Sequence, residues 1–196
     1  VFSGGWTLEA AESVVGADEA LDGLSGLVNK SLVIVEEQEG KSRYRFLETI
    51  RQYAMEKLVE AGEAIATRDR HLDFMLGVME YSPTRMFGME DLELLDRIES
   101  EHANLRAALE WATENHPATA LKLAYSAGGF WTIRDYNAEA QFWCITILRK
   151  TEAMSELEED RGRLYGLLGW LMMTLGEHKK GRAASEQAIT LAEKSN

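Results

Sequence analysis

The chain has 196 residues, 45% of them hydrophobic and 28% charged, and a formal net charge of −12. This composition is that of an ordinary folded protein of one large or two small domains. The acidic balance opposes nucleic-acid binding over most of the surface, and no apolar run is long enough to span a bilayer. A single cysteine cannot form an internal disulfide, so we expect a reducing, cytoplasmic setting without a membrane partner. Because the chain opens on Val1, we also expect it to be a piece of a longer protein.

The first sixty or so residues predict two short helices followed by a β-hairpin. Thr7 is a plausible N-cap for a helix that ends at Gly16, and Asp18 for a second helix that ends near Asn29. The β-branched run 31–35 and the alternating run 43–46 predict two strands joined by a charged turn over 36–41. A strong helix is expected over 48–61, and its apolar face comprises Ile50, Tyr53, Ala54, Met55 and Leu58.

The sequence from residue 64 onward indicates helices joined by loops. A helix is expected over 64–81, broken at Ser82-Pro83, with a loop over 86–90. Helical spacing then continues to the end of the chain. It predicts one hairpin from the helices 119–134 and 137–150, and a second from 161–175 and 178–194, separated by an acidic link over 151–160.

These two hairpins carry an internal repeat. The first set is Gly128, Trp131, Asp135, Ala140, Cys144 and Ile147, and the second is Gly169, Met172, Gly176, Gly181, Ser185 and Ala188. The internal spacings are the same, and the offset of about 41 residues lies within the periods of helical arrays. Small residues at the first and fourth positions would let two helices approach closely. A stack of helical hairpins is a binding scaffold, which favours interaction over catalysis.

The two halves resemble known folds. The hairpins resemble tetratricopeptide repeats, with Gly128 and Gly169 as the signature glycines, although Asp135 stands where glycine is usual. The first part resembles a winged helix without its first helix, its wing lying at 36–42. The predicted fold is therefore mainly α: a truncated winged helix with one β-hairpin, then a tetratricopeptide-like array of α-helical hairpins. The predicted domains are 1–62, a linking helical segment at 63–117, and the repeats at 118–196.

Four segments together resemble one bacterial family, the STAND-class signalling ATPases often described as LuxR- or AfsR-type transcriptional regulators. They are Phe2-Ser3-Gly4-Gly5-Trp6, Asn29-Lys30-Ser31-Leu32-Val33, the run from Tyr44 to Ala54, and Asn104-Leu105-Arg106-Ala107-Ala108-Leu109. In that family a P-loop ATPase domain precedes a winged helix and a tetratricopeptide array. The resemblance implies a regulatory, protein-interaction segment that couples partner or inducer binding on the array to an ATPase domain absent from this chain.

The same resemblance implies the cofactor and the partners. ATP or ADP would bind the absent N-terminal domain, and no cofactor is expected in this chain. The expected partners are the chain's own ATPase domain, a protein or small inducer on the array, and a second copy. In related plant and animal proteins a Met-His-Asp motif after the hairpin senses the ADP phosphate. The matching positions are Phe46, Leu47 and Glu48, and Leu47 cannot donate a hydrogen bond to phosphate.

Candidate partner-binding residues lie on the repeats: Trp131, Trp143, Trp170, Lys179, Lys180 and Arg182. Buried tryptophans and a solvated basic turn are the simpler interpretations of this set. Aromatic anchors and an acidic partner are the alternative.

Catalysis has no support in the sequence. The four histidines do not fall three or four residues apart on one helix, and there is one cysteine, so a zinc site is not expected. We predict no catalytic or metal-binding residue and no enzyme activity for this chain. A DNA-binding winged helix is the alternative function, because Lys41, Arg43 and Arg45 give the wing positive charge. The helix before the wing is acidic, however, and we therefore do not expect nucleic acid as a partner of this chain.

Overall fold

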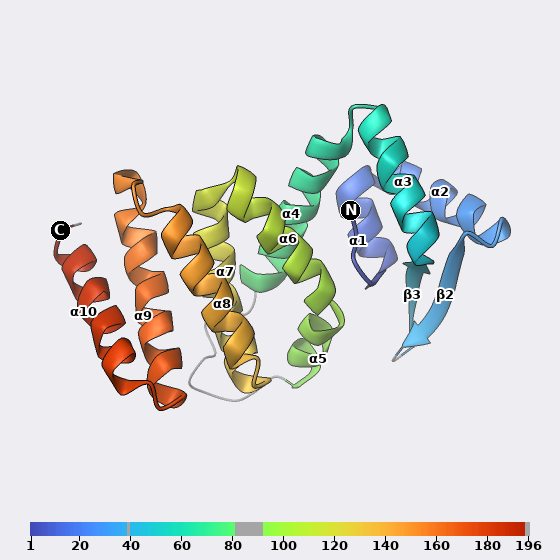
Figure 1. Ribbon diagram of the computed structural model, residues 1–196. Coiled ribbons are helices and arrows are strands. Elements are labelled where there is room, and N and C mark those ends of the chain that lie inside the picture. Colours follow the sequence, from blue (N-terminus) through green and yellow to red (C-terminus); the bar gives the residue numbers. More distant parts are fainter. Residues whose placement is uncertain (39, 81–91, 195–196) are drawn as a thin grey trace. The chain divides into compact units, whose positions relative to one another are not determined.

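A computed structural model describes residues 1–38, 40–80 and 92–194 (Figure 1). The predicted break at Ser82-Pro83 and the predicted loop over 86–90 lie outside these residues. The chain divides into two compact units, Val1–Gly77 with Asp96–Ala108, and Val78–Leu95 with Leu109–Asn196. The predicted fold class is confirmed: a small sheet with short helices comes first, and helical hairpins follow.

Two short helices open the first unit. Helix α1 (Leu8–Val15) begins where predicted, because the Thr7 hydroxyl accepts a hydrogen bond from the Ala10 amide at 3.2 Å. Gly16 ends α1 with φ at +99° and is also the N-cap of α2 (Ala17–Asn29). The prediction of Asp18 as the cap of α2 is therefore wrong. Asp18 lies in the first turn, where its charge complements the helix dipole.

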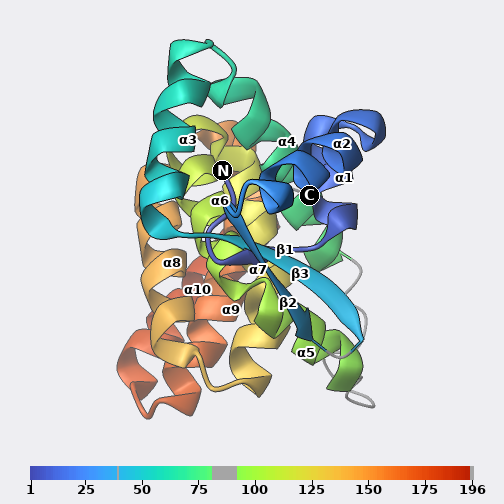
Figure 2. The same cartoon turned by 90° about the vertical axis from the view of Figure 1, so that its right-hand side faces the viewer.

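The sheet has three antiparallel strands in the order β1-β3-β2 (Figure 2). Strand β2 (Val33–Gln38) pairs with β3 (Lys41–Phe46), so that Val33 faces Phe46 and Gln38 faces Lys41. The predicted charged turn was too long, because the ladder runs through residues 36–38. Strand β1 (Gly5–Trp6) was not predicted, since two residues are too few to show an alternating pattern.

Helix α3 (Glu48–Glu60) follows the sheet, and α4 (Ala64–Glu80) follows α3. Every residue of α3 is described and none is fully buried, but Ile50, Ala54, Met55 and Leu58 of the predicted apolar face are half-buried. Tyr53, the remaining residue of that face, is 58% exposed. The periodicity therefore indicates the more buried side of this helix, although no residue of α3 is fully buried.

Helices α5 (Leu92–Ser100) and α6 (His102–Asn115) contribute residues to both units. The first unit takes residues 96–100 of α5 and 102–108 of α6. The last residues of α6 belong to the second unit. Helix α6 is thus one continuous element shared by the two units.

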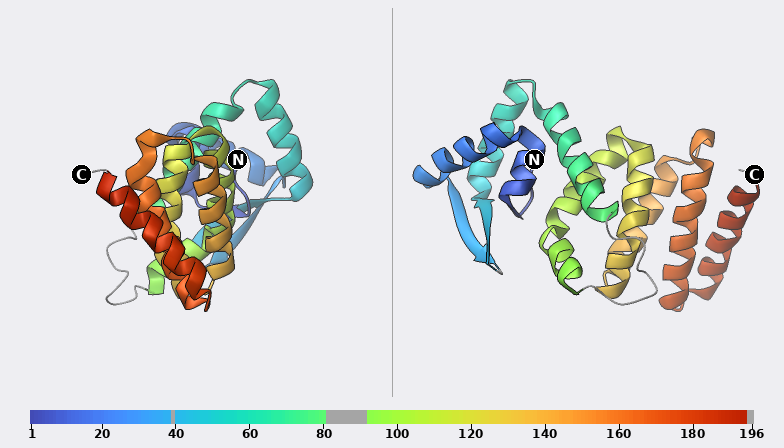
Figure 3. Two further views of the ribbon diagram at one scale, coloured as in Figure 1. Left: turned by 60° about the vertical axis from the view of Figure 1, so that its left-hand side comes forward. Right: turned by 180° about the vertical axis from the view of Figure 1, so that it is seen from behind.

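The second unit contains two helical hairpins with the predicted offset (Figure 3). Helices α7 (Pro117–Ile133) and α9 (Glu158–Thr174) both have 17 residues and begin 41 residues apart. Helices α8 (Asn137–Lys150) and α10 (His178–Lys194) begin 41 residues apart as well. A short 3-10 turn, Ser155–Leu157, fills the link. The predicted acidic link is shorter than expected, since Glu158, Glu159 and Asp160 form the first turn of α9.

The hairpin turns have the same backbone geometry. Asp135 and Gly176, which are equivalent positions of the repeat, have φ values of +61° and +77°. In both turns the next amide reaches back to the helix, from Tyr136 to the Trp131 carbonyl at 2.7 Å and from Glu177 to the Met172 carbonyl at 2.8 Å. This is a Schellman-type ending, so Asp135 adopts the left-handed conformation that glycine adopts elsewhere.

Close helix packing depends on glycine in the second hairpin. A Cβ atom on Gly169 would lie 2.5 Å from Ser185 Oγ and 3.1 Å from the Gly181 carbonyl oxygen. A Cβ on Gly181 would lie 2.9 Å from the Gly169 oxygen, so α9 and α10 touch through their backbones. Gly128 is also tight, but its nearest atom is Leu167 Cδ1 at 2.8 Å on α9. The repeat therefore preserves backbone geometry while the closest contacts of its two signature glycines differ.

Candidate functional site

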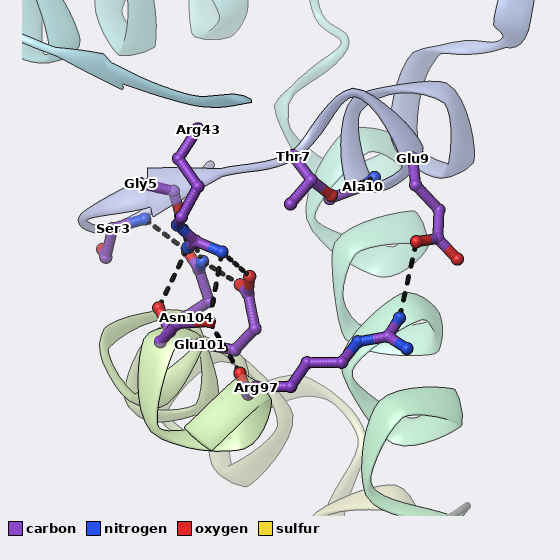
Figure 4. A network of polar contacts seen from close by, with 10 residues as sticks. Ser3, Gly5, Thr7, Glu9, Ala10, Arg43, Arg97, Glu101 and Asn104 are labelled. Carbon is purple, nitrogen blue, oxygen red and sulfur yellow. Dashed lines mark hydrogen bonds and ion pairs between the residues drawn. The ribbon is translucent and has the colours of Figure 1, made fainter. Parts of the chain in front are cut away.

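Two segments about a hundred residues apart in sequence meet in the first unit (Figure 4). Asn104, which has no exposed surface, accepts a hydrogen bond through Oδ1 from the Ser3 amide at 2.8 Å. Its Nδ2 donates to the Gly5 carbonyl at 2.9 Å and to Glu101 Oε2 at 2.6 Å. One side-chain amide on α6 thus holds the backbone on either side of Gly4.

The intervening glycine permits this close docking. Gly4 has φ at +85°, a region that residues with a Cβ rarely adopt. A Cβ placed there would lie 3.2 Å from Ala103 Cβ, on the first turn of α6. The Ser3-Gly4-Gly5 segment is therefore shaped to lie against α6.

Arg43 extends the same network from the wing strand β3. Its Nη1 donates to Glu101 Oε1 at 2.7 Å and to Ser100 Oγ at 3.2 Å. Its Nη2 donates to the carbonyl oxygens of Gly5 and Ser100, both at 2.9 Å. The Arg43 and Glu101 side chains are only 12% and 5% exposed. We call this set the polar hub; it comprises Ser3, Gly5, Arg43, Ser100, Glu101 and Asn104.

His71 lies beside the hub on α4 and is 3% exposed. Its ring packs edge-on against Phe2, with 5.1 Å between ring centroids. Burial lowers the pKa of His71 to about 4, and a hydrogen bond with Asn104 opposes this shift. The imidazole is therefore neutral at pH 7 and is adapted to packing, not to proton transfer.

The hub binds elements together and carries no catalytic chemistry. Its charged groups are a guanidinium and a carboxylate that neutralise each other, and its remaining groups are amides, carbonyls and a hydroxyl. Among the residues that the structure describes, no cluster of three histidine, cysteine, aspartate or glutamate side chains could hold a metal ion. None of the described helices is long and apolar enough to cross a membrane.

The predicted nucleotide-sensor positions lie at the end of β3 and the start of α3, outside the polar hub. The Phe46 ring packs on Trp6 with 4.8 Å between centroids, and Leu47 is 48% exposed at the N-cap of α3. Glu48 accepts hydrogen bonds from Arg51 at 2.7 and 2.8 Å. Hydrogen bonds from Arg51 and then Gln52 lower the pKa of Glu48 to about 2.

The candidate partner-binding tryptophans lie on three different helices. Trp131 on α7 has no exposed surface and packs the helix core, so it offers nothing to a partner in this conformation. Trp170 on α9 is 40% exposed. Trp143 on α8 is half-buried and packs edge-on against Phe142. Only Trp170 of these three presents a large surface.

The candidate basic residues lie at the start of α10. Lys179 and Arg182 are exposed, whereas Lys180 forms an ion pair with Glu177 at 2.7 Å. The predicted contact of this cluster with an acidic partner stays a prediction.

The described charged side chains of α2 and of the wing are mainly acidic. Helix α2, which precedes the wing, exposes Asp18, Glu19 and Asp22. On the wing, Arg43 is committed to the hub, and Arg45 is paired with Glu36 at 2.8 Å. The assignment of Arg43 to the positive charge of the wing surface is therefore wrong, because Glu101 neutralises it in a buried pair.

Comparison with known proteins identifies the fold of the first part. Residues 1–59 match the winged helix-turn-helix domain family. No solved structure matches the chain.

Longer relatives occur in mycobacteria. A Mycobacterium tuberculosis (strain H37Rv) protein named "Putative HTH-type transcriptional regulator" is 39% identical over 153 residues, which cover 75% of this chain and 17% of that protein. A Mycobacterium bovis protein of the same description matches to the same extent. A second protein of the same Mycobacterium tuberculosis strain, named "Uncharacterized protein", is 43% identical over 77 residues, or 36% of this chain and 20% of that protein. The chain thus spans about a sixth of the length of the regulators it matches.

Proposed function

We propose that this chain is the regulatory and protein-interaction segment of an HTH-type transcriptional regulator of the STAND class. In this proposal the winged helix-turn-helix domain is a packing module, and the helical array binds a protein partner, a small inducer or a second copy. The resemblance to regulators that are much longer than this chain supports a role within a larger protein.

The observation that supports the proposal most directly is that the Arg43 side chain is largely buried and hydrogen-bonded within its own unit. A wing arginine that contacted DNA would lie exposed beside other cations, because phosphate contacts supply most of the affinity. Here the Arg43 side chain is 12% exposed and makes four hydrogen bonds to other parts of the same unit. The wing is thus built to hold the start of α6, which favours packing over DNA binding.

Regulation would follow from differential binding to two states of an ATPase domain. A partner that binds the array more tightly in one state shifts the population toward that state. ATP or ADP would belong to the ATPase domain, and the array's occupant would set the balance between the two nucleotide states. Trp170 is one of the exposed aromatic side chains that the described array offers to such an occupant, together with Tyr125 and Phe142.

The test is nucleotide exchange in the longer protein, with and without the repeats at residues 118–196. Release of a fluorescent ADP analogue should change by at least roughly fivefold when the array is removed, which is the lower range of allosteric coupling. Circular dichroism of both proteins checks that the remaining domains are folded. An unchanged release rate in a folded, nucleotide-bound protein would contradict the proposal.

The second candidate is DNA binding by the winged helix, which the family match of residues 1–59 favours. On the wing the accessible arginine is Arg45, at 44% side-chain exposure. This candidate predicts that Arg45→Ala weakens duplex binding and lowers its dependence on salt. An Arg45→Lys variant, which keeps the charge, is the matched control and should retain most of the binding.

A further inference from the structure

The hub connects α6 to two strands of the sheet. Asn104 and Glu101 belong to the start of α6 and its N-cap, whereas Ser3 and Gly5 belong to the β1 segment and Arg43 to β3 (Figure 4). The contacts between them are hydrogen bonds of 2.6 to 3.2 Å among largely buried groups. Such groups cannot separate without leaving polar atoms unpaired.

Helix α6 continues beyond the hub. Residues 102–108 lie in the first unit and residues 109–115 in the second. Backbone hydrogen bonds couple successive turns of a helix, so fraying or displacement of one half affects the other. The second half of α6 is thus joined through the helix backbone to Glu101 and Asn104.

We propose that the hub is a coupling device that transmits changes in α6 to the β1-β3-β2 sheet of the winged helix. This inference rests on the proposed regulatory function, because it names the element through which the array would act. Asn104 and Arg43 are positioning residues in this device: they fix the sheet to α6 and touch no ligand.

The device differs from a simple stabilising contact in one measurable respect. Independent contributions to local stability add, whereas coupled elements give non-additive effects. If the hub transmits changes in α6, a weakened second half of α6 loosens the sheet only while the hub is intact.

The perturbation is placed at Glu110, an exposed residue in the second-unit part of α6. Glu110→Gly lowers helix stability, and Glu110→Ala is the matched variant that removes the same charge without that loss. The readout is amide hydrogen exchange of Ser3 and of the strand residues 41–46 in the 196-residue chain. In the otherwise unchanged chain, exchange should be about three- to fivefold faster with glycine than with alanine.

The Glu110→Gly and Glu110→Ala variants are then compared in a chain that also carries Arg43→Met and Glu101→Gln. These two changes together remove the ion pair and leave no unpaired buried charge. There the glycine-to-alanine ratio should fall to near one. A second background, Arg43→Lys, keeps the charge but loses the forked contacts and should give an intermediate ratio. Circular dichroism verifies that each background is folded.

Two outcomes would overturn the inference. An equal ratio in all backgrounds would show that α6 and the sheet respond independently of the hub. An equal acceleration by Ala183→Gly, an exposed site on α10, would show that exchange reports unfolding of the whole chain. No ligand enters this measurement, so it can succeed where the nucleotide-exchange test fails, and the reverse also holds.

Discussion

At the scale of single residues, Arg43 and Arg45 show how context decides the role of a side chain. They lie two positions apart on β3, and each pairs with a glutamate. The Arg43 pair is buried, whereas both members of the Arg45 pair are at least 44% exposed. An exposed ion pair contributes little, but an unpaired buried charge is costly.

This contrast predicts that the same substitution, arginine to methionine, lowers the free energy of unfolding more at Arg43 than at Arg45. Arg43→Met should lower the free energy of unfolding by about 3–5 kcal/mol, because it leaves the Glu101 carboxylate buried without its cation. Arg45→Met should cost less than about 1 kcal/mol. Urea unfolding of both variants measures the difference, and similar losses would show that the hub pair is solvated.

His71 predicts a loss of stability in acid. In the unfolded chain the imidazole of His71 has its ordinary pKa of 6.5, whereas in the folded chain its pKa is lowered to about 4. The unfolded state therefore binds more protons between these values, and stability falls as the pH drops from 6.5 toward 4. The full effect is on the order of 3 kcal/mol, from a pKa difference of about 2.5.

Comparison with His71→Phe isolates this contribution. The variant keeps an aromatic ring beside Phe2 but cannot take up a proton, so its stability should change less over the same pH range. NMR titration of the imidazole in the original chain checks the pKa directly. Parallel pH profiles for the two proteins would contradict the assignment.

The sequence contains both segments of the hub as motifs, but it does not predict that they are in contact. The Phe2–Trp6 segment and the Asn104–Leu109 segment are both among the motifs that resemble the bacterial family. Their contact depends on tertiary structure that brings residues 3 and 104 together, and no local periodicity encodes it. A partial signal was available, because Asn104 interrupts an otherwise apolar helical face and a buried polar group requires partners.

At the scale of elements, the hairpins were the most predictable part. Helices α8 and α10 have the predicted bounds at 137–150 and 178–194, since strong apolar periodicity and turn residues define them. Helix α3 begins at the predicted residue, and most of its apolar face is half-buried without any residue being fully buried. Local sequence determines where a helix forms, whereas burial depends on neighbours.

Two glycines of α9 predict opposite effects of the same substitution. Gly169→Ala should destabilise the chain by about 1–3 kcal/mol, because the new methyl group would overlap Ser185 and the backbone of α10. Gly166 has no atom within 4 Å of a Cβ position, so Gly166→Ala should stabilise by about 0.5–1 kcal/mol. Thermal unfolding measures both changes. A neutral Gly169→Ala would mean that α9 and α10 can separate without cost.

At the scale of the whole molecule, the distribution of charge opposes binding to DNA. The net charge of −12 opposes binding to a polyanion. Composition alone indicated this, but the structure adds that the wing arginine most removed from solvent serves an internal contact. The match to a winged helix-turn-helix family establishes the fold of residues 1–59, and a shared fold does not establish a shared ligand.

The most direct measurement of the central claim is a titration of a fluorescent DNA duplex with the intact chain, followed by anisotropy over a series of salt concentrations. If the winged helix is a packing module, no saturable binding should occur even at roughly 50 mM salt, where phosphate contacts are strong. Saturable binding that weakens steeply with added salt and is lost in Arg45→Ala would contradict the claim.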